Sequence, residues 1–251
     1  MNTELHGKIV VVTGGGGGIG SEICRIFAHA GAKVVLTHRG GAGKARAEKT
    51  LISLAGHDHL LIQASVDDYE QQKNLAHQIE ARYGSVDILV NNAGMTQFVP
   101  ADDLEGLEDE VIDTIFKVNW RGAFATVRSL KSLLLKSGDG LVVNISSIAG
   151  TTGIGSNVAY CASKSAMNTM TISLARALAP KVRVISVAPG LVEGEYTDKL
   201  DPTWTEQQRQ LNPLQRLTTA TDVAQAVLAC ATLLKYSTGC VIPVDGGRPL
   251  T

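Results

Sequence analysis

The sequence predicts an α/β fold: one doubly wound domain, with a seven-stranded parallel sheet flanked by helices on both faces. Short apolar runs of four to six residues alternate with longer segments of helical period through most of the 251 residues. The interior runs contain few polar residues, as expected for strands that helices cover on both faces. No linker rich in proline, glycine and serine and no fixed-period repeat divides the chain, so residues 1–251 are interpreted as a single domain.

The elements follow one another in a regular order. The first apolar run opens on glycines, and a helix that Gly31 ends follows it. The expected strands are 8–13, 33–37, 59–63, 86–90, 140–145, 182–187 and 240–244, and the expected helices are 21–30, 43–54, 68–83, 107–135, 160–178 and 221–234. Alternating strands and helices imply parallel strands joined by right-handed crossovers. Residues 191–213 break the alternation with two prolines, Trp204 and many polar residues, and a segment this long is typical of a substrate lid.

Composition excludes several classes of protein. With 44% hydrophobic and 19% charged residues, the chain is ordinary for a globular protein, and its formal net charge of −1 without a basic run argues against nucleic-acid or membrane partners. The four cysteines are scattered and form no CxxC pair, which favours structural thiols over disulfides or a metal site. Residues 1–7 are polar and resemble no signal peptide, and no apolar run reaches the ~18 residues of a membrane span. A cytoplasmic location is therefore expected.

A glycine-rich loop joins the first strand to the first helix. It runs Thr13-Gly-Gly-Gly-Gly-Gly-Ile-Gly20, and its candidate cofactor-binding residues are Gly14, Gly18, Ile19 and Gly20. Glycines let the backbone approach a pyrophosphate closely, and the helix that follows offers unpaired N–H groups to it. A flexible loop is the alternative, but the position after an all-apolar strand favours dinucleotide binding.

The end of the second strand is where a dinucleotide-binding fold selects its ribose. Here the strand ends Leu36-Thr-His-Arg39 without an acidic residue. An arginine can pair with a 2′-phosphate, whereas a carboxylate would bind a free 2′-hydroxyl. Arg39 therefore favours NADP(H) over NAD(H). If Arg39 is only a solvated loop residue, both cofactors are possible.

Tyr160 and Lys164 lie four residues apart, so one helical turn places them on the same face. A free phenol has a pKa near ~10, and a neighbouring ammonium is expected to lower it toward neutral pH, where proton transfer is efficient. The same spacing is common on ordinary helix faces. Its context favours catalysis, because Ser147 follows a central strand thirteen residues upstream and its hydroxyl can donate to a substrate carbonyl. Ser146 is a possible alternative to Ser147.

Asn119 is expected in the middle of a helix, where asparagine is unfavourable. A local helix defect that holds a water explains it, and an amide satisfied by packing is the alternative.

Together these residues resemble the classical short-chain dehydrogenase/reductase family over essentially the whole chain. The matching motifs are TGxxxGxG at 13–20, NNAG at 91–94, Asn119, Ser147 with Tyr160 and Lys164, Pro189-Gly190, and VDGG at 244–247. The resemblance implies a single-domain Rossmann fold with a catalytic tetrad of Asn119, Ser147, Tyr160 and Lys164. Tyr160 would be the general acid in reduction and the base in oxidation, Lys164 would lower its pKa and hold the ribose, Ser147 would orient the carbonyl, and Asn119 would position a proton-relaying water. Asn92 and Gly94 would support the cofactor, and Pro189, Gly190 and Val192 would line the nicotinamide.

Three positions depart from the family pattern. Ser65 and Val66 stand where many members have an aspartate that contacts adenine. Gly194 replaces a threonine that binds the carboxamide, which leaves this contact to the backbone or Thr197. Gly17 replaces a basic residue that many NADP-linked members carry, so Arg39 alone favours NADP.

The expected function is NAD(P)(H)-dependent hydride transfer between a nicotinamide and a carbonyl or secondary alcohol, with a 3-oxoacyl-carrier-protein reductase-like pattern. Sugar, steroid or aromatic alcohol dehydrogenases of the same family are alternatives. A non-catalytic dinucleotide-binding redox sensor is the alternative from another class, although such proteins usually lose the tyrosine or the lysine. The resemblance also implies a homotetramer or dimer, to which the apolar residues Met167, Met170, Ile172 and Leu174 would contribute unless they face the core.

Overall fold

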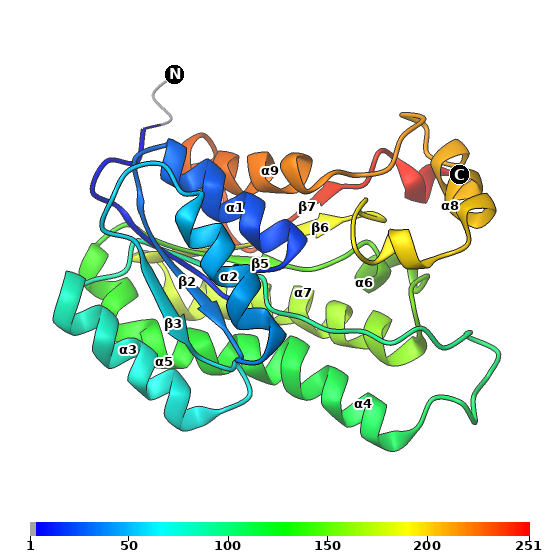
Figure 1. Cartoon of the computed structure of the whole chain (residues 1–251), viewed down its shortest axis with the longest axis horizontal. Coiled ribbons are helices and arrows are strands. Elements are labelled where there is room, and N and C mark those ends of the chain that lie inside the picture. Colours follow the sequence, from blue (N-terminus) through cyan, green and yellow to red (C-terminus); the bar gives the residue numbers. More distant parts are fainter. Residues whose placement is uncertain (1–3) are drawn as a thin grey trace.

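In the computed structural model, which describes residues 4–251, seven strands form one parallel sheet in the order β3-β2-β1-β4-β5-β6-β7 (Figure 1). The strands are β1 (Ile9–Val12), β2 (Lys33–His38), β3 (Leu60–Gln63), β4 (Ile88–Asn91), β5 (Gly140–Ile145), β6 (Val182–Pro189) and β7 (Val241–Val244). The predicted parallel, seven-stranded sheet is confirmed. The strand order reverses between β1 and β4, and a doubly wound fold binds its ligands at such a reversal.

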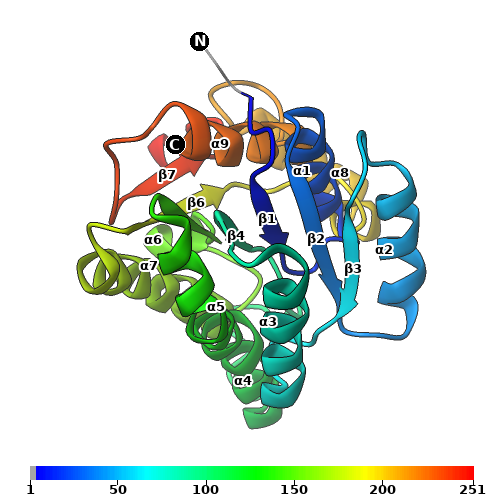
Figure 2. The same cartoon turned by 90° about the vertical axis from the view of Figure 1, so that its left-hand side faces the viewer.

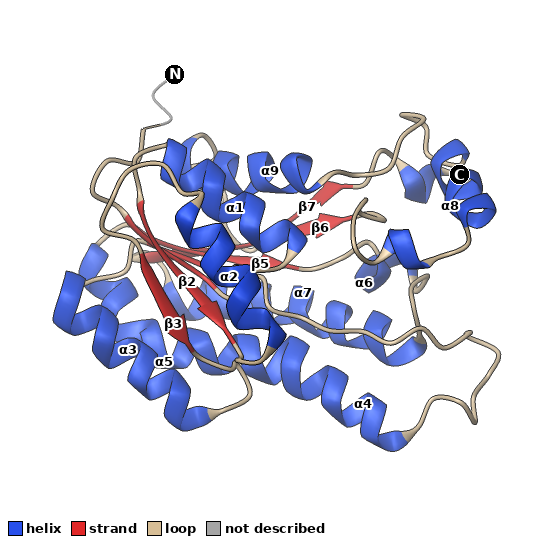
Figure 3. Cartoon of the chain, viewed as in Figure 1, coloured by secondary structure: helices blue, strands red, loops and turns tan. Residues whose placement is uncertain are grey.

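Helices cover both faces of the sheet, as Figure 2 and Figure 3 show. They are α1 (Gly18–His29), α2 (Ala42–Ile52), α3 (Tyr69–Tyr83), α4 (Asp109–Phe116), α5 (Ala123–Ser137), α6 (Ala149–Thr152), α7 (Val158–Leu178), α8 (Pro202–Gln210) and α9 (Ala220–Thr232). Side chains alternate along each strand, so one strand feeds two cores. In β1, Val10 and Val12 pack with α1 and α9, while Ile9 and Val11 pack with α3, α5 and α7.

Every predicted strand and helix has a counterpart in the structure whose ends differ by no more than two residues, apart from four larger differences. Helix α1 begins at Gly18 and not at Ser21, because the last glycines of the loop already form its first turn. The expected helix within 107–135 is interrupted by a π-helical turn, η1 (Lys117–Gly122), between α4 and α5. Helices α6 and α8 were not predicted, because α6 has only four residues and α8 buries none of its side chains.

The sequence signals at helix ends are visible in the structure. Gly84 ends α3 in the left-handed conformation with φ 78°, and Asp68 caps its start by accepting a hydrogen bond from the Gln71 N–H. Cys24, Cys161 and Cys230 lie in helices as expected, and all four cysteines are free thiols. Within residues 4–251 no helix is long and apolar enough to span a membrane. Residues 1–3, part of the segment predicted to lack a signal sequence, lie outside the described residues.

Candidate functional site

The carboxyl ends of the strands open into one cleft of about 1410 Å³. This volume exceeds the ~300–1,000 Å³ of a typical small-ligand pocket, as a site for a dinucleotide together with a second molecule must. Every sequence-predicted site residue except Asn119 lines the cleft: Gly14, Gly18, Ile19, Gly20, Arg39, Ser65, Val66, Asn92, Gly94, Ser147, Tyr160, Lys164, Pro189, Gly190 and Val192. The structure thus brings together residues that span 178 positions of sequence, from 14 to 192.

The glycine loop leaves its backbone open to close approach by a ligand. Gly14 has φ +66°, a conformation that L side chains rarely adopt, and a Cβ on Gly20 would lie 2.4 Å from the Gly14 carbonyl oxygen. The Asn92 amide holds this loop, because its Nδ2 donates to the carbonyls of Thr13 at 2.9 Å and Gly14 at 3.2 Å. The start of α1 therefore presents its free N–H groups to the cleft, an arrangement that fits a pyrophosphate.

The far end of the cleft contains two arginines in different situations. The guanidinium of Arg39 is exposed and makes no hydrogen bond or ion pair with any residue in 4–251. Arg46, on α2, reaches across the cleft to Glu195 with an Nη1–Oε2 distance of 3.1 Å. His38 is buried beside them, and burial, followed by the nearby charge of Lys44, lowers its pKa. A neutral His38 accepts a hydrogen bond from the Gly40 N–H at 3.0 Å.

The residues after β3 differ from the aspartate that many members of the resembled family have at this position. Ser65 and Val66 line the cleft as predicted, and so does Asp67, which the sequence interpretation passed over. The Asp67 carboxylate accepts from the Ser65 hydroxyl at 2.5 Å and pairs with Lys117 at 3.1 Å. Its pKa is lowered mainly by the Ser65 contact, so Asp67 is charged but already engaged.

Asn119 lies in the π-helical turn and is fully buried. Its Oδ1 accepts from the Met95 N–H at 2.8 Å, and its Nδ2 donates to the Met95 carbonyl at 3.0 Å and the Ser163 hydroxyl at 3.1 Å. The predicted local helix defect is confirmed, and packing also satisfies the amide. Gly94 lies between Asn119 and Lys164, since a Cβ there would be 3.3 Å from Asn119 Oδ1 and 3.7 Å from Lys164 Nζ.

Helix α7 carries both Tyr160 and Lys164 into the cleft. Asn157 caps this helix by accepting from the Tyr160 N–H at 2.7 Å, and its own Nδ2 donates to the Gln97 carbonyl at 2.6 Å. Lys164 is buried, with Nζ donating to the Ile145 carbonyl at 2.8 Å and lying 5.7 Å from the centre of the Tyr160 ring. The asparagine before an apolar helix was a visible capping signal that the sequence interpretation did not use.

The two serines after β5 have different partners. Ser146 is 3% exposed and its hydroxyl donates to the Lys164 carbonyl at 3.3 Å, so it fixes α7 against the strand. Ser147 is more open to the cleft and its hydroxyl accepts from the Ala149 N–H at 3.1 Å. The Ser147 hydroxyl also contacts Tyr160, so the two side chains predicted to act together lie side by side in the cleft.

The expected shift of the Tyr160 pKa was wrong in direction for the protein on its own. Desolvation raises the pKa of Tyr160 to about 12, and the opposing contact with Ser147 is weaker. Desolvation also lowers the pKa of Lys164 to about 8. Burial disfavours the charged form of both groups, and it outweighs the mutual stabilisation that a solvent-exposed pair would show.

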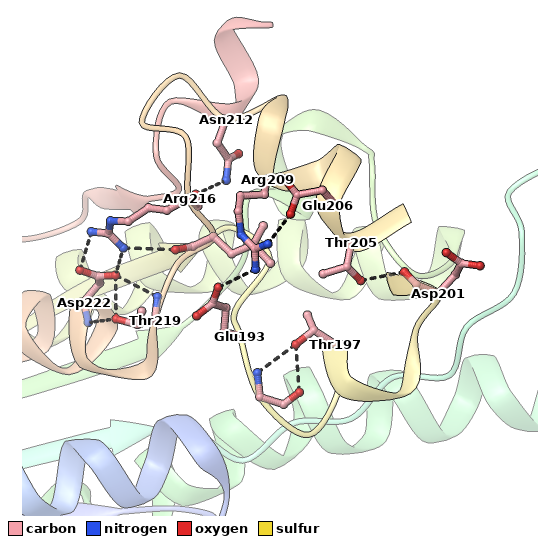
Figure 4. A network of polar contacts seen from close by, with 12 residues as sticks. Glu193, Thr197, Asp201, Thr205, Glu206, Arg209, Asn212, Arg216, Thr219 and Asp222 are labelled. Carbon is pink, nitrogen blue, oxygen red and sulfur yellow. Dashed lines mark hydrogen bonds and ion pairs between the residues drawn. The ribbon is translucent and has the colours of Figure 1, made fainter. Parts of the chain in front are cut away.

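Residues 191–213 lie beside the cleft as a loop, a 3-10 turn, η2 (Thr197–Lys199), and α8. Within this segment Glu193 pairs with Arg209 at 3.1 Å, and at its end the Asn212 Nδ2 donates to the Arg216 carbonyl at 2.6 Å (Figure 4). The Thr197 hydroxyl bonds to both the N–H and the carbonyl of Gly194 at 2.9 Å, and Thr197 does not line the cleft. The Thr197 hydroxyl is thus occupied by Gly194, and a carboxamide contact from Thr197 or from the backbone stays a prediction.

The residues fit a dinucleotide better than a metal. The glycines of the loop after β1 stand where a Cβ would clash. The start of α1 faces the cleft, and the unpaired Arg39 lies at one end of it. Within residues 4–251 no group of three or more histidine, cysteine, aspartate or glutamate side chains could hold a metal ion.

Comparison with known proteins gives a consistent result. The pattern described as short chain dehydrogenase matches residues 8–204. The chain is 34% identical over 242 residues to the 3-oxoacyl-[acyl-carrier-protein] reductase FabG of Staphylococcus aureus, covering 96% of this chain and 97% of the other. It is 36% identical over 251 residues to nodulation protein G of Rhizobium sp., covering 97% and 98%. A crystal structure of a short-chain dehydrogenase/reductase, SDR:Glucose/ribitol dehydrogenase, from Brucella melitensis superposes with a TM-score of 0.92 at 29% identity, covering 99% of both chains.

Proposed function

Because the chain belongs to the short-chain dehydrogenase family and is an NAD(P)-dependent oxidoreductase, we propose that it reduces a carbonyl compound of the 3-oxoacyl type with NADPH. The observation that carries the proposal is the pairing of Tyr160 and Lys164 on α7 beside the open hydroxyl of Ser147. Desolvation keeps this phenol protonated at neutral pH, the form that a proton donor to a carbonyl oxygen requires.

Each member of the predicted tetrad has a role in this scheme. Ser147 contacts Tyr160 in the protein on its own and would turn its hydroxyl to donate to the substrate carbonyl oxygen, while Tyr160 delivers the proton to the same oxygen as it gains charge. The bound nicotinamide supplies the hydride. Lys164 holds a positive charge one helical turn from the phenol, where it stabilises the phenolate left behind. Asn119 fixes the backbone of Met95 and, through Ser163, the adjacent turn of α7. We also propose that it positions a water that relays protons from Lys164.

The preference for NADPH rests on Arg39. Its exposed guanidinium has no partner among residues 4–251, and it lies at the end of β2 where the ribose phosphate is expected. Gly14, Gly18, Ile19 and Gly20 would receive the pyrophosphate, while Pro189, Gly190 and Val192 would face the nicotinamide. We further propose that residues 191–213 form a substrate lid, since α8 buries no side chain and is held by polar contacts.

The oligomeric state and location extend the proposal. We expect a homotetramer or dimer in the cytoplasm. Met167 and Met170 are buried in the subunit and only Ile172 is exposed, at 40%, so these residues offer a small surface for assembly. Sedimentation velocity tests the assembly.

A panel of ketones and 3-oxoacyl thioesters, assayed with NADPH and NADH, tests the function. We expect turnover with NADPH, and Tyr160→Phe should abolish it while NADPH still binds. Arg39→Ala should weaken NADPH binding much more than NADH binding. Tight NADPH binding without turnover of any carbonyl would indicate a redox sensor, and most of the wild-type rate in Tyr160→Phe would refute the assigned acid.

A further inference from the structure

The cleft has a cation at its substrate end that the hydride-transfer chemistry does not use. We infer that Arg248 binds an anionic group, a carboxylate or phosphate, on the carbonyl substrate, and this inference rests on the proposed function. Arg248 begins the 3-10 turn η3 (Arg248–Leu250) and lines the same cleft as Tyr160 and Ser147. A guanidinium presents a planar fork of donors that matches both kinds of anion.

Arg248 contacts only neutral groups. Its Nη1 donates to the Thr251 hydroxyl at 3.1 Å and its Nη2 to the Gln208 side-chain oxygen at 3.4 Å. Within residues 4–251 no acidic group lies within ion-pair distance of it. A guanidinium has five N–H donors, so Arg248 keeps both its charge and most of its donors for a ligand.

The other charged residues around this end of the cleft already have partners. Glu193 pairs with Arg209 at 3.1 Å (Figure 4), and Asp201 caps α8 by accepting from the Thr203 and Trp204 N–H groups at 2.7 and 3.0 Å. Arg248 itself forms no ion pair among the described residues, so its charge is open to a ligand.

Three side chains, Tyr196, Trp204 and Gln208, line the cleft together with Tyr160 and Arg248. Tyr196 is close enough to Tyr160 to contribute to the raised pKa of that phenol. Trp204 and Gln208 lie four residues apart on α8, so they share a face, and both line the cleft. Gln208 in turn contacts Arg248. A substrate with its carbonyl at Tyr160 can thus extend along α8 to the guanidinium.

The space between the two ends is apolar. Four large side chains that line the cleft are unusually exposed: Phe98 at 60%, Ile154 at 72%, Tyr196 at 40% and Trp204 at 41%. Apolar side chains gathered around a cleft mark a ligand surface. The structure therefore assigns a substrate with a carbonyl at one end, an apolar body and an anionic group at the other end.

Arg248 also helps to hold the lid, because its contact with Gln208 joins η3 to α8, as does the 3.0 Å bond from the Thr251 hydroxyl to the Leu211 carbonyl. Loss of this contact would disturb any substrate, charged or not. The test must therefore compare substrates that differ only in charge. Arg216→Gln is a matched control, since it removes one guanidinium close to the same segment while neither Arg216 nor its partner Asp222 lines the cleft.

The experiment uses two substrate pairs: an aromatic keto acid with its methyl ester, and a 3-oxoacyl phosphopantetheine thioester with the phosphate-free pantetheine thioester. The wild type should prefer the anionic member of at least one pair, which identifies the anion. Arg248→Gln should reduce that kcat/KM ratio at least tenfold, mainly through KM, and Arg248→Lys should restore part of it. Arg216→Gln should leave the ratio unchanged.

An equal loss for both members of a pair in Arg248→Gln, or no preference for the anion in the wild type, overturns the inference. If no carbonyl is reduced at all, the proposed function fails, and calorimetric binding of the keto acid and its ester to the wild type and Arg248→Gln still tests Arg248. Equal affinities in that measurement would refute the assignment.

Discussion

Replacing Lys164 with methionine should remove a pH-dependent cost to stability while abolishing activity. Burial lowers the pKa of Lys164 from 10.5 to about 8, so the folded state holds the ammonium less well than the unfolded chain does. At 1.36 kcal/mol per pKa unit, this shift costs about 3 kcal/mol of stability. The cost is fully present below pH 8 and is relieved as the pH rises from about 8 toward 10.5. Methionine fills a similar volume without the charge.

The methionine variant also loses the 2.8 Å hydrogen bond to the Ile145 carbonyl, and an unsatisfied buried carbonyl costs roughly 1–3 kcal/mol. The net effect of the substitution on the free energy of unfolding at any one pH is therefore small. The decisive quantity is how the difference in unfolding free energy between the wild type and Lys164→Met changes with pH. Between pH 7 and pH 9.5 the wild type should gain roughly 2 kcal/mol relative to Lys164→Met, because the lost hydrogen bond contributes equally at both pH values.

Urea unfolding of both proteins at the two pH values measures this difference. Lys131→Met, at an exposed position on α5, controls for the loss of one positive charge. A stability difference between wild type and Lys164→Met that stays constant from pH 7 to pH 9.5 would show that Lys164 is not desolvated, and would refute the explanation of its lowered pKa.

Three further substitutions test the surroundings of the site. Asn119→Ala leaves the Met95 N–H and carbonyl unpaired, so the free energy of unfolding should fall by about 2–4 kcal/mol, and a loss below about 1 kcal/mol would mean that water replaces the amide. Gly150→Val should lower the melting temperature and the activity together, because a Cβ at Gly150 would lie 2.7 Å from the backbone of α7, whereas normal activity would show that α6 can shift. Arg46→Gln frees Glu195 and should speed cofactor release in stopped flow with a modest change in stability, and an unchanged release rate would show that the pair does not close the cleft.

Much of the sheet was predictable because apolar strands between two helical layers leave a clear pattern. The bounds of β5 agree with the prediction residue for residue, and β2 differs by one residue. The positions of the site residues followed as well, since parallel strands end at one edge and motifs placed after them must meet there. Even the helix defect at Asn119 was indicated by an unfavourable residue type in the middle of a helix.

Other features depend on three-dimensional contacts that no local pattern records. Helix α8 buries no side chain, so it has no apolar face for a periodicity to reveal. The Arg46–Glu195 pair joins residues 149 positions apart, and charge alone does not identify partners at that separation. The pKa of Tyr160 was predicted in the wrong direction because helical spacing gives the distance to Lys164 but not the desolvation of both groups.

The cost of burying Lys164 explains why α7 is held at several points along its length. At its start Asn157 caps the helix, and near its middle the Thr171 hydroxyl forms 2.8 Å hydrogen bonds with Asn144 of β5 and Ser186 of β6. These buried hydrogen bonds fix the rotation of α7 against the sheet, because turning it would leave polar groups unpaired in the core. A helix that could turn would move Lys164 toward water and regain about 3 kcal/mol, the desolvation cost derived from its pKa. The polar contacts at Asn144 and Ser186 thus keep an unfavourable charge beside Tyr160, where a phenolate formed by proton transfer would need it.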